Sequence, residues 1–193
     1  MPGLERILAF GPKGSGKTHQ LLKVAQWLLP TGAQFYILDT DDSYPRSLEA
    51  FPGLSASDGG NVHATFAYDW QEYVSWLEGD KKKGQQGVLD LAVPGRDWLV
   101  VDRMDKSWPR AQNYISEEIY GEELSERLIA AKKRLAAQSK SATQISGVDK
   151  ADWQVINATY MGWSMKLMYK SRCHVYMTAG VTVGRSDDET EIK

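Results

Sequence analysis

Gly11-Pro12-Lys13-Gly14-Ser15-Gly16-Lys17-Thr18 is a complete match to the phosphate-binding pattern G-x-x-x-x-G-K-[ST]. The apolar residues 6–10 before it predict a buried strand, and residues 18–29 after it predict a helix. Glycines let the backbone curl until several N–H groups point inward, and the helix N-terminus adds partial positive charge. In this motif Lys17 contacts the β- and γ-phosphates, and the Thr18 hydroxyl binds Mg²⁺. The strand and helix around residues 11–18 favour a site for a nucleoside triphosphate over a glycine-rich turn that matches by chance.

The length of 193 residues suits one α/β domain with a sizeable core. A net charge of −2 gives no overall basic field for nucleic acid, although a local basic patch remains compatible with it. The single cysteine, Cys173, excludes an internal disulfide and a zinc site built from cysteines, which predicts a reducing compartment. The sequence shows no signal-peptide pattern, and no apolar run approaches the roughly 20 residues that span a membrane. We therefore expect a cytoplasmic protein, in a bacterium or a phage-infected host, without a membrane partner.

A second apolar run, residues 34–38, leads into an acidic cluster of Asp39, Asp41 and Asp42 around Thr40. Ligands of open parallel sheets bind beyond the carboxyl ends of the strands, so this cluster would face a nucleotide. Asp and Thr are also frequent in helix caps and solvated turns, and that alternative stays open.

The run Trp98-Leu99-Val100-Val101-Asp102 has the Walker B pattern of four apolar residues followed by an acid. Such a run is typical of a central strand, and its carboxylate meets Mg²⁺ beside Thr18 or through the metal's water shell. The pattern alone is weak evidence. Downstream of a complete phosphate-binding loop, it makes Asp102 the predicted metal ligand together with Thr18.

The remaining segments predict further strands and helices around one sheet. Strands are expected at 61–66 and 173–179, and helices at 70–77, at 116–140 and from 152 onward. We expect an irregular connection at 43–57, a loop or hairpin at 79–96, and a mobile loop at 139–150. Lys81, Lys82 and Lys83 are typical of a solvated surface, with contact to a phosphate backbone as the alternative.

The chain is expected to form one domain over residues 1–193, with 103–150 as a helical or loop insertion. The sheet ends soon after the strand at 173–179. We therefore expect either that the native chain extends beyond residue 193 or that its end pairs as a hairpin.

These features together resemble the RecA-like ATPases, a group of P-loop NTPases, and in particular their compact phage-encoded members. The resemblance covers roughly residues 4–40, 97–105 and 152–180. It implies an α/β fold in three layers, α/β/α, with a mostly parallel RecA-like sheet. It also implies binding and hydrolysis of ATP with Mg²⁺, in phage or bacterial DNA metabolism such as recombination or annealing.

The resemblance also implies roles for individual residues. Residues 37–41 are similar to the RecA pattern of apolar strand, Asp, small residue and acidic base, so Asp41 would orient and deprotonate the attacking water. Residues 175–179 look like the strand whose polar tip senses the γ-phosphate, which is Thr178 in this chain. With Lys17 and Asp102, these two residues make up the predicted catalytic set.

The chain departs from the family pattern at three positions. The base is usually Glu, and Asp41 is one methylene shorter. Many relatives, including terminase motors, carry Glu directly after the Walker B acid, where this chain has Arg103, and Asp105 is then the competing base. The sensing residue is often Gln, Asn or His rather than Thr. The two-residue spacing from Asp39 lets Asp41 face the same side of an extended chain, which favours Asp41 as the base.

Three other functions use a similar core. A nucleoside or nucleotide kinase would need an arginine-rich lid, for which Arg103, Arg110, Arg127 and Arg134 are available. A terminase-like packaging motor and a nucleotide-gated binding subunit that hydrolyses slowly are the others. The sequence lacks the Asn-Lys-x-Asp guanine motif, which argues against GTP.

Sites of this family are often completed by a basic residue from a neighbouring subunit. Lys170, Arg172 and Arg185, near the last strands, are the candidates in this chain. We therefore expect a homo-oligomer, either a ring or a filament, with single-stranded DNA as a candidate partner.

Overall fold

A five-stranded sheet, in which all neighbouring strands are parallel, forms the centre of the computed structural model, which describes residues 3–137 and 150–181. The strand order across the sheet is β1-β7-β6-β2-β3. The strands are β1 (Arg6–Gly11), β2 (Phe35–Asp39), β3 (Val62–Phe66), β6 (Trp98–Val101) and β7 (His174–Gly180).

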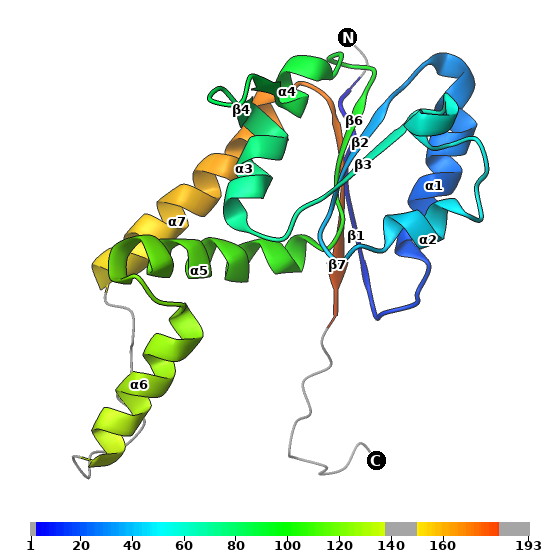
Figure 1. The fold of residues 1–193 in the computed structure, drawn as a ribbon. Helices are drawn as coiled ribbons and strands as arrows, with labels where there is room; N and C mark the ends of the chain where they lie inside the picture. The colour runs from blue at the N-terminus through cyan, green and yellow to red at the C-terminus, as the bar shows by residue number, and fades with distance from the viewer. Residues whose placement is uncertain (1–2, 138–149, 182–193) are drawn as a thin grey trace, which may run out of the picture.

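Helices cover both faces of the sheet (Figure 1). One face carries α1 (Lys17–Leu28) and α2 (Tyr44–Leu48). The other carries α3 (Trp70–Glu78), α5 (Ser107–Tyr120) and α7 (Lys150–Met165). The predicted α/β fold, three layers with a mostly parallel sheet, is confirmed, and residues 11–18 lie where β1 gives way to α1.

Alternation along the strands divides the core into two apolar layers. The layer under α1 includes Leu21, Leu22, Phe35, Ile37, Trp98 and Val100. The opposite layer includes Leu38, Trp70, Tyr73, Leu99, Val101 and Trp163. Neighbouring residues of one strand thus point into different layers, which is why a sheet covered on both faces needs the continuous apolar runs of β2 and β6.

β1 is an edge strand, so the prediction that it is buried was wrong. Among the strands described, it pairs with β7 alone. Its side chains Leu8 and Phe10 are 54% and 74% exposed. An apolar run predicts the strand itself, but the number of neighbours that the strand acquires depends on the rest of the sheet.

The helix expected over 116–140 is divided into α5 and α6 (Leu124–Ala137). The division lies at Gly121, whose φ of 71° is left-handed and whose N–H donates to the carbonyl of Glu117 at 2.8 Å. Glycine adopts this conformation after a helix without the strain that a Cβ would cause. The apolar residues that predicted this helix, Leu124, Leu128, Ala131 and Leu135, all follow Gly121, so they carried no information about the break.

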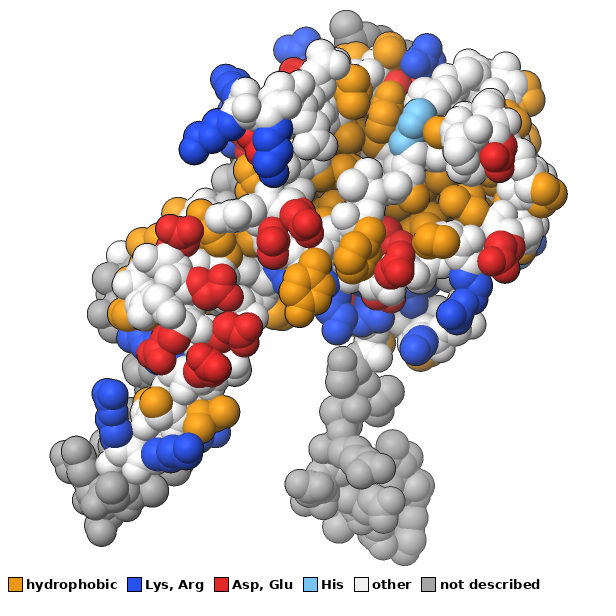
Figure 2. Space-filling view, in the orientation of Figure 1, with side chains coloured by type: hydrophobic (Ala, Val, Ile, Leu, Met, Phe, Trp, Pro, Cys, Tyr) orange, Lys and Arg blue, Asp and Glu red, His pale blue; other side chains and the backbone are white. Residues whose placement is uncertain are grey.

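Several connections contain short elements. The segment 43–57, predicted to be irregular, includes α2 and the start of a 3₁₀ turn, Ala56–Asp58. The segment 79–96 contains the expected hairpin, β4 (Gly79–Asp80) with β5 (Gln85–Gln86), followed by α4 (Val88–Leu91). Lys81, Lys82 and Lys83 are exposed in this hairpin, and Figure 2 shows basic side chains gathered over it.

Parts of the sequence-based expectations lie outside the described residues. These are most of the loop at 139–150 and the chain from Thr182 onward, which includes Arg185. Within the described part of the chain, no helix combines the length and apolarity needed to cross a membrane.

Candidate functional site

Residues 11–18 connect β1 to α1 at the carboxyl edge of the sheet. Gly14 and Gly16 have φ of 79° and 83°, a left-handed conformation that glycine adopts readily. Because α1 begins at Lys17, its first N–H groups have no partner within the helix and are available to an anion. The Nζ atom of Lys17 donates to the carbonyls of Gly11 at 2.9 Å and Pro12 at 3.0 Å, which holds the ammonium across the loop.

Asp102 joins this loop to the centre of the sheet. The Thr18 hydroxyl donates to one oxygen of the Asp102 carboxylate at 3.1 Å, and the Thr178 hydroxyl donates to the other. Asp102 directly follows β6 and is 2% exposed, and this burial raises the pKa of its carboxyl above the ordinary value. The two hydroxyls thus fix the orientation of a buried carboxylate beside the phosphate loop.

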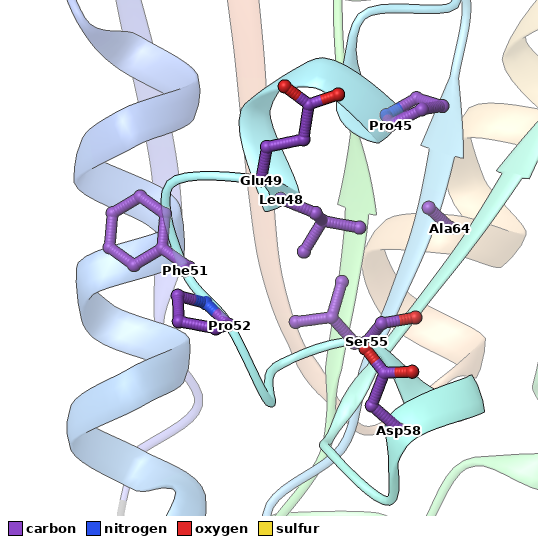
Figure 3. A pocket seen from close by; sticks show the side chains of 9 residues that line it. Pro45, Leu48, Glu49, Phe51, Pro52, Ser55, Asp58 and Ala64 are labelled. Atoms are coloured by element: carbon purple, nitrogen blue, oxygen red, sulfur yellow. The ribbon is translucent and has the colours of Figure 1, made fainter.

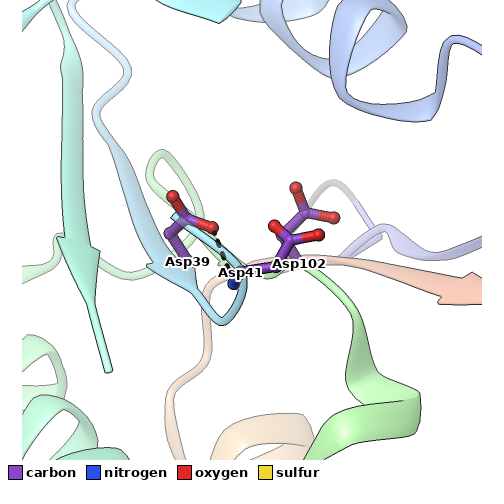
Figure 4. Close-up of side chains that lie close together, drawn as sticks. All are labelled: Asp39, Asp41 and Asp102. Atoms are coloured by element: carbon purple, nitrogen blue, oxygen red, sulfur yellow. Dashed lines mark hydrogen bonds between the residues drawn. The ribbon is translucent and has the colours of Figure 1, made fainter. Parts of the chain in front are cut away.

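The oxygens of Thr18 and Asp102 fit Mg²⁺, which prefers oxygen ligands and keeps several waters. Carboxylate oxygens of Asp39, Asp41 and Asp102 all lie within 4.8 Å of one another (Figure 4). Negative charges this close repel one another unless positive charge lies nearby. A divalent cation held by Thr18 and Asp102 would supply that charge.

Asp39 holds the turn that carries Asp41. It is 1% exposed, and its carboxylate accepts the N–H of Asp41 at 3.3 Å and the N–H of Tyr44 at 3.0 Å, where α2 begins. Burial raises the pKa of the Asp39 carboxyl. The interpretation of the acidic cluster as a local cap therefore fits Asp39, whereas the side chain of Asp41 remains 40% exposed.

A pocket of about 290 Å³ brings most of the predicted site residues together. The phosphate loop forms one wall, and residues that follow β2 and β6 form the other. Its lining consists of Lys13, Gly14, Ser15, Gly16, Lys17, Thr18, His19, Asp41, Ser43, Ser47, Asp102 and Arg103.

Thr178 contacts Asp102 but does not line this pocket. Its side chain is completely buried, and its hydroxyl accepts the N–H of Arg103 at 2.8 Å while it donates to Asp102. These contacts position the Asp102 carboxylate. The role in sensing the γ-phosphate stays a prediction.

Arg103 is a residue of the pocket that the sequence analysis did not place there. Its guanidinium pairs with Asp105, from Nη2 at 2.8 Å and from Nε at 3.0 Å. Asp105 also accepts the N–H of Gly180 at 2.8 Å. Burial alone would raise the pKa of Asp105, but the hydrogen bonds from Arg103 and Gly180 lower it. The available signal was the position of Arg103 directly after the Walker B acid, at the end of a central strand.

Other predicted basic residues lie away from the pocket. Lys170 and Arg172 precede β7 and are therefore at the amino edge of the sheet. The seven residues of β7 span about 20 Å, so neither side chain completes the pocket of its own chain. A contribution to a neighbouring subunit stays a prediction. Arg110 donates to the carbonyls of Thr40, at 2.9 Å, and Ala67, which ties together the ends of β2 and β3.

A larger hollow, of about 530 Å³, lies between α2, the loop that follows it and β3 (Figure 3). Its lining consists of Pro45, Leu48, Glu49, Phe51, Pro52, Ser55, Asp58, Val62 and Ala64. This mixture of apolar and acidic side chains contains no cation that would bind phosphate. The hollow therefore does not compete with the pocket of residues 13–19 as a phosphate site.

Replacing Thr178 by Val should weaken Mg²⁺ binding about 10- to 100-fold, because a metal ligand loses the group that orients it. Titration calorimetry with Mg²⁺ in the presence of a triphosphate nucleotide measures this affinity. Thr178→Ser keeps the hydroxyl and is the matched control. Parental Mg²⁺ affinity in a folded Thr178→Val variant would mean that Asp102 needs no such support.

No family model and no curated protein matches the chain. Among solved structures, the chain is similar to the conjugation coupling protein TcpA of pCW3, in its monomer form with ATPγS. The two are 15% identical, with 92% of this chain and 42% of that chain covered, at a TM-score of 0.33. The chain thus spans less than half the length of that protein, and so distant a likeness carries no argument about function.

Proposed function

We propose that this chain binds ATP together with Mg²⁺ and hydrolyses it, as a single domain. The observation that carries the proposal is one pocket lined by the phosphate loop, by the hydrogen-bonded pair of Thr18 and Asp102, and by Asp41. A triphosphate needs N–H donors and cations, Mg²⁺ needs oxygen ligands, and hydrolysis needs a group that directs water. The lining of this pocket offers all three.

The reaction requires positioning and charge neutralisation more than covalent chemistry by the protein. The N–H groups of the loop and the ammonium of Lys17 bind the β- and γ-phosphates and stabilise the charge that develops on them. Thr18 and Asp102 would hold Mg²⁺, which would supply positive charge to offset the negative charge of the phosphates.

In the proposed mechanism, Asp41 accepts a hydrogen bond from a water molecule and directs its oxygen at the γ-phosphorus. A bond forms between that oxygen and phosphorus while the bond from phosphorus to the β–γ bridging oxygen breaks. The electron pair of the broken bond stays on ADP, and the proton of the water passes to the Asp41 carboxylate.

Asp41 is a better candidate for this base than Asp105. The Asp41 side chain lines the pocket and is 40% exposed, so a water can reach it. Both carboxylate oxygens of Asp105 already accept hydrogen bonds from Arg103, and one accepts the Gly180 N–H as well. Asp105 also lies outside the pocket lining, and the hydrogen bond from the Gly180 N–H favours its charged form whether or not Arg103 is paired with it.

Lys17→Ala should abolish hydrolysis and leave the fold intact, because Lys17 touches the phosphate loop and not the apolar core. We expect a loss of roughly 10²-fold or more in the release of phosphate from ATP. Lys23→Ala, which removes an exposed lysine from the same helix, should keep the parental rate. Parental turnover in Lys17→Ala would overturn the assignment of the site.

Asp41→Asn should lower turnover by about 10²-fold or more while ATP still binds, because a general base contributes about 10²–10⁴ in rate. Asp105→Asn should lose much less. Single-turnover phosphate release and equilibrium binding of ATP, measured on both variants, separate catalysis from affinity. The opposite ranking of the two variants would transfer the role of base to Asp105.

The release of phosphate from ATP also distinguishes the alternative functions. Phosphate release from ATP without an acceptor distinguishes hydrolysis from a kinase reaction, and binding without turnover would favour a nucleotide-gated subunit. Among the residues that the structure describes, Arg103 is the one arginine of the pocket lining, so the arginines considered for a kinase lid are not gathered there. Stimulation by double-stranded DNA would favour a packaging motor.

We further infer a role in phage or bacterial DNA metabolism, in recombination or annealing, from the resemblance to RecA-like ATPases. The same resemblance supports a ring or filament and single-stranded DNA as the partner, with the exposed Lys81–Lys83 run as a candidate contact. With an ATP analogue and single-stranded DNA present, light scattering should give a protein mass above one subunit. A mass of one subunit under these conditions counts against the assembly.

A further inference from the structure

We propose that Arg103 binds the terminal phosphate of the nucleotide from within the same chain, and that it leaves its ion pair with Asp105 to do so. The inference deepens the proposed function and rests on it, because its ligand is the γ-phosphate in the pocket of residues 13–19. It makes Arg103 a substrate-binding residue of this site, in place of a basic group from a neighbouring subunit.

The backbone of Arg103 directs its side chain toward this edge of the sheet. Its φ of 65° and ψ of 58° are left-handed, a conformation that residues with a Cβ adopt infrequently. Its N–H donates to Thr178 at 2.8 Å, which secures the turn to the end of β7. Unusual conformations of this kind persist where surrounding contacts enforce them, and they gather at functional sites.

The guanidinium lies between two carboxylates at the mouth of the pocket. On one side, Nε and Nη2 bind Asp105 at 3.0 and 2.8 Å. On the other side, Nη1 lies 4.0 Å from Asp41, beyond hydrogen-bond distance. Among the described residues, Nη1 makes no hydrogen bond, although it carries two donors. The side chain is 24% exposed, so a ligand in the pocket can reach it.

The guanidinium of Arg103 packs against the end of β7. A Cβ placed on Gly180 would lie 2.9 Å from Nη2, so the guanidinium packs directly against the glycine backbone. Asp105 accepts the Gly180 N–H, so the ion pair and the end of β7 form one connected unit. Movement of Arg103 away from Asp105 would therefore change the contacts of the last residue of β7.

A γ-phosphate is a stronger partner for Arg103 than one carboxylate. A terminal phosphate carries more charge than a carboxylate and presents three oxygens, and the planar guanidinium fork matches this geometry. ADP lacks that group, so it leaves Arg103 with Asp105. Charge also favours the exchange, because a γ-phosphate in this pocket would lie near the carboxylates of Asp41 and Asp102, and the Arg103 guanidinium in the same lining would offset their repulsion.

The test compares the affinities of a non-hydrolysable ATP analogue and of ADP, each with Mg²⁺, in the full chain. In Arg103→Ala the affinity for the analogue should fall about tenfold, the loss expected for a hydrogen-bonded charge, while ADP binds as in the parent. Turnover should fall by on the order of 10²-fold. Arg103→Lys keeps a point charge without the fork, so it should recover part of the affinity and little of the turnover.

Two further variants separate this role from a structural one. Asp105→Asn keeps an oxygen for the Gly180 N–H but holds Arg103 less tightly, so the affinity for the analogue should rise. That gain should vanish in the double variant of Arg103→Ala and Asp105→Asn. Lys133→Ala, which removes an exposed positive charge of α6, controls for the loss of charge and should match the parent.

Equal losses of ADP and analogue affinity in Arg103→Ala, or no loss of either, would overturn the proposal. Failure of the proposed function has a different signature, because the parent would then release no phosphate from ATP. The comparison of analogue with ADP still decides the role of Arg103 in that case, since it does not depend on hydrolysis.

Discussion

The buried carboxylate of Asp102 is the group on which the arrangement of the site depends. It accepts hydrogen bonds from the hydroxyls of Thr18, at the start of α1, and of Thr178, near the end of β7. Burying a charged group without such donors is costly, and burial does raise the pKa of this carboxyl. The hydroxyls keep Asp102 oriented toward the phosphate loop, and a cation bound there would remove much of the remaining electrostatic cost.

The order of strands explains why these residues meet. β7 lies between β1 and β6, so Thr178 is next to both the strand that leads into the phosphate loop and the strand that ends at Asp102. All strands of the five-stranded sheet run in one direction, so the residues that follow β1, β2 and β6 gather at the same edge. The same geometry takes Lys170 and Arg172 to the opposite edge.

Charge at the pocket is balanced between two groups of side chains. Lys13 and Lys17 come from the phosphate loop, whereas Asp41 and Asp102 come from the ends of β2 and β6. Arg103 follows β6, as Asp102 does, but it is positively charged like the lysines of the phosphate loop. Its ion pair with Asp105 neutralises that charge in the lining of the pocket, and the proposed exchange would pair it with a γ-phosphate instead.

Much of this protein could be predicted from the sequence, because the relevant chemistry is local. Residues 11–18 are contiguous and their spacing is set by the turn they form, so the phosphate-loop motif can be recognised from the sequence alone. The apolar runs of β2 and β6 predict strands because each residue must face one of two apolar layers. The acids at the ends of these runs could be assigned to one edge, since parallel strands end together. The end of α5 at Gly121 also has a local cause, a glycine with a left-handed backbone, but the apolar spacing used to predict the helix lies entirely after it.

Only the tertiary structure decided the properties that depend on contacts between distant segments, namely exposure, burial and side-chain direction. The exposure of β1 follows from its place at the edge of the sheet, which its own residues do not specify. Burial of Thr178 against Asp102, and not in the pocket wall, follows from the pairing of β6 with β7. The direction of Arg103 follows from a left-handed backbone that its contacts with Thr178 and Asp105 sustain. These features arise from contacts between residues far apart in the chain, so no segment of the sequence carries them alone.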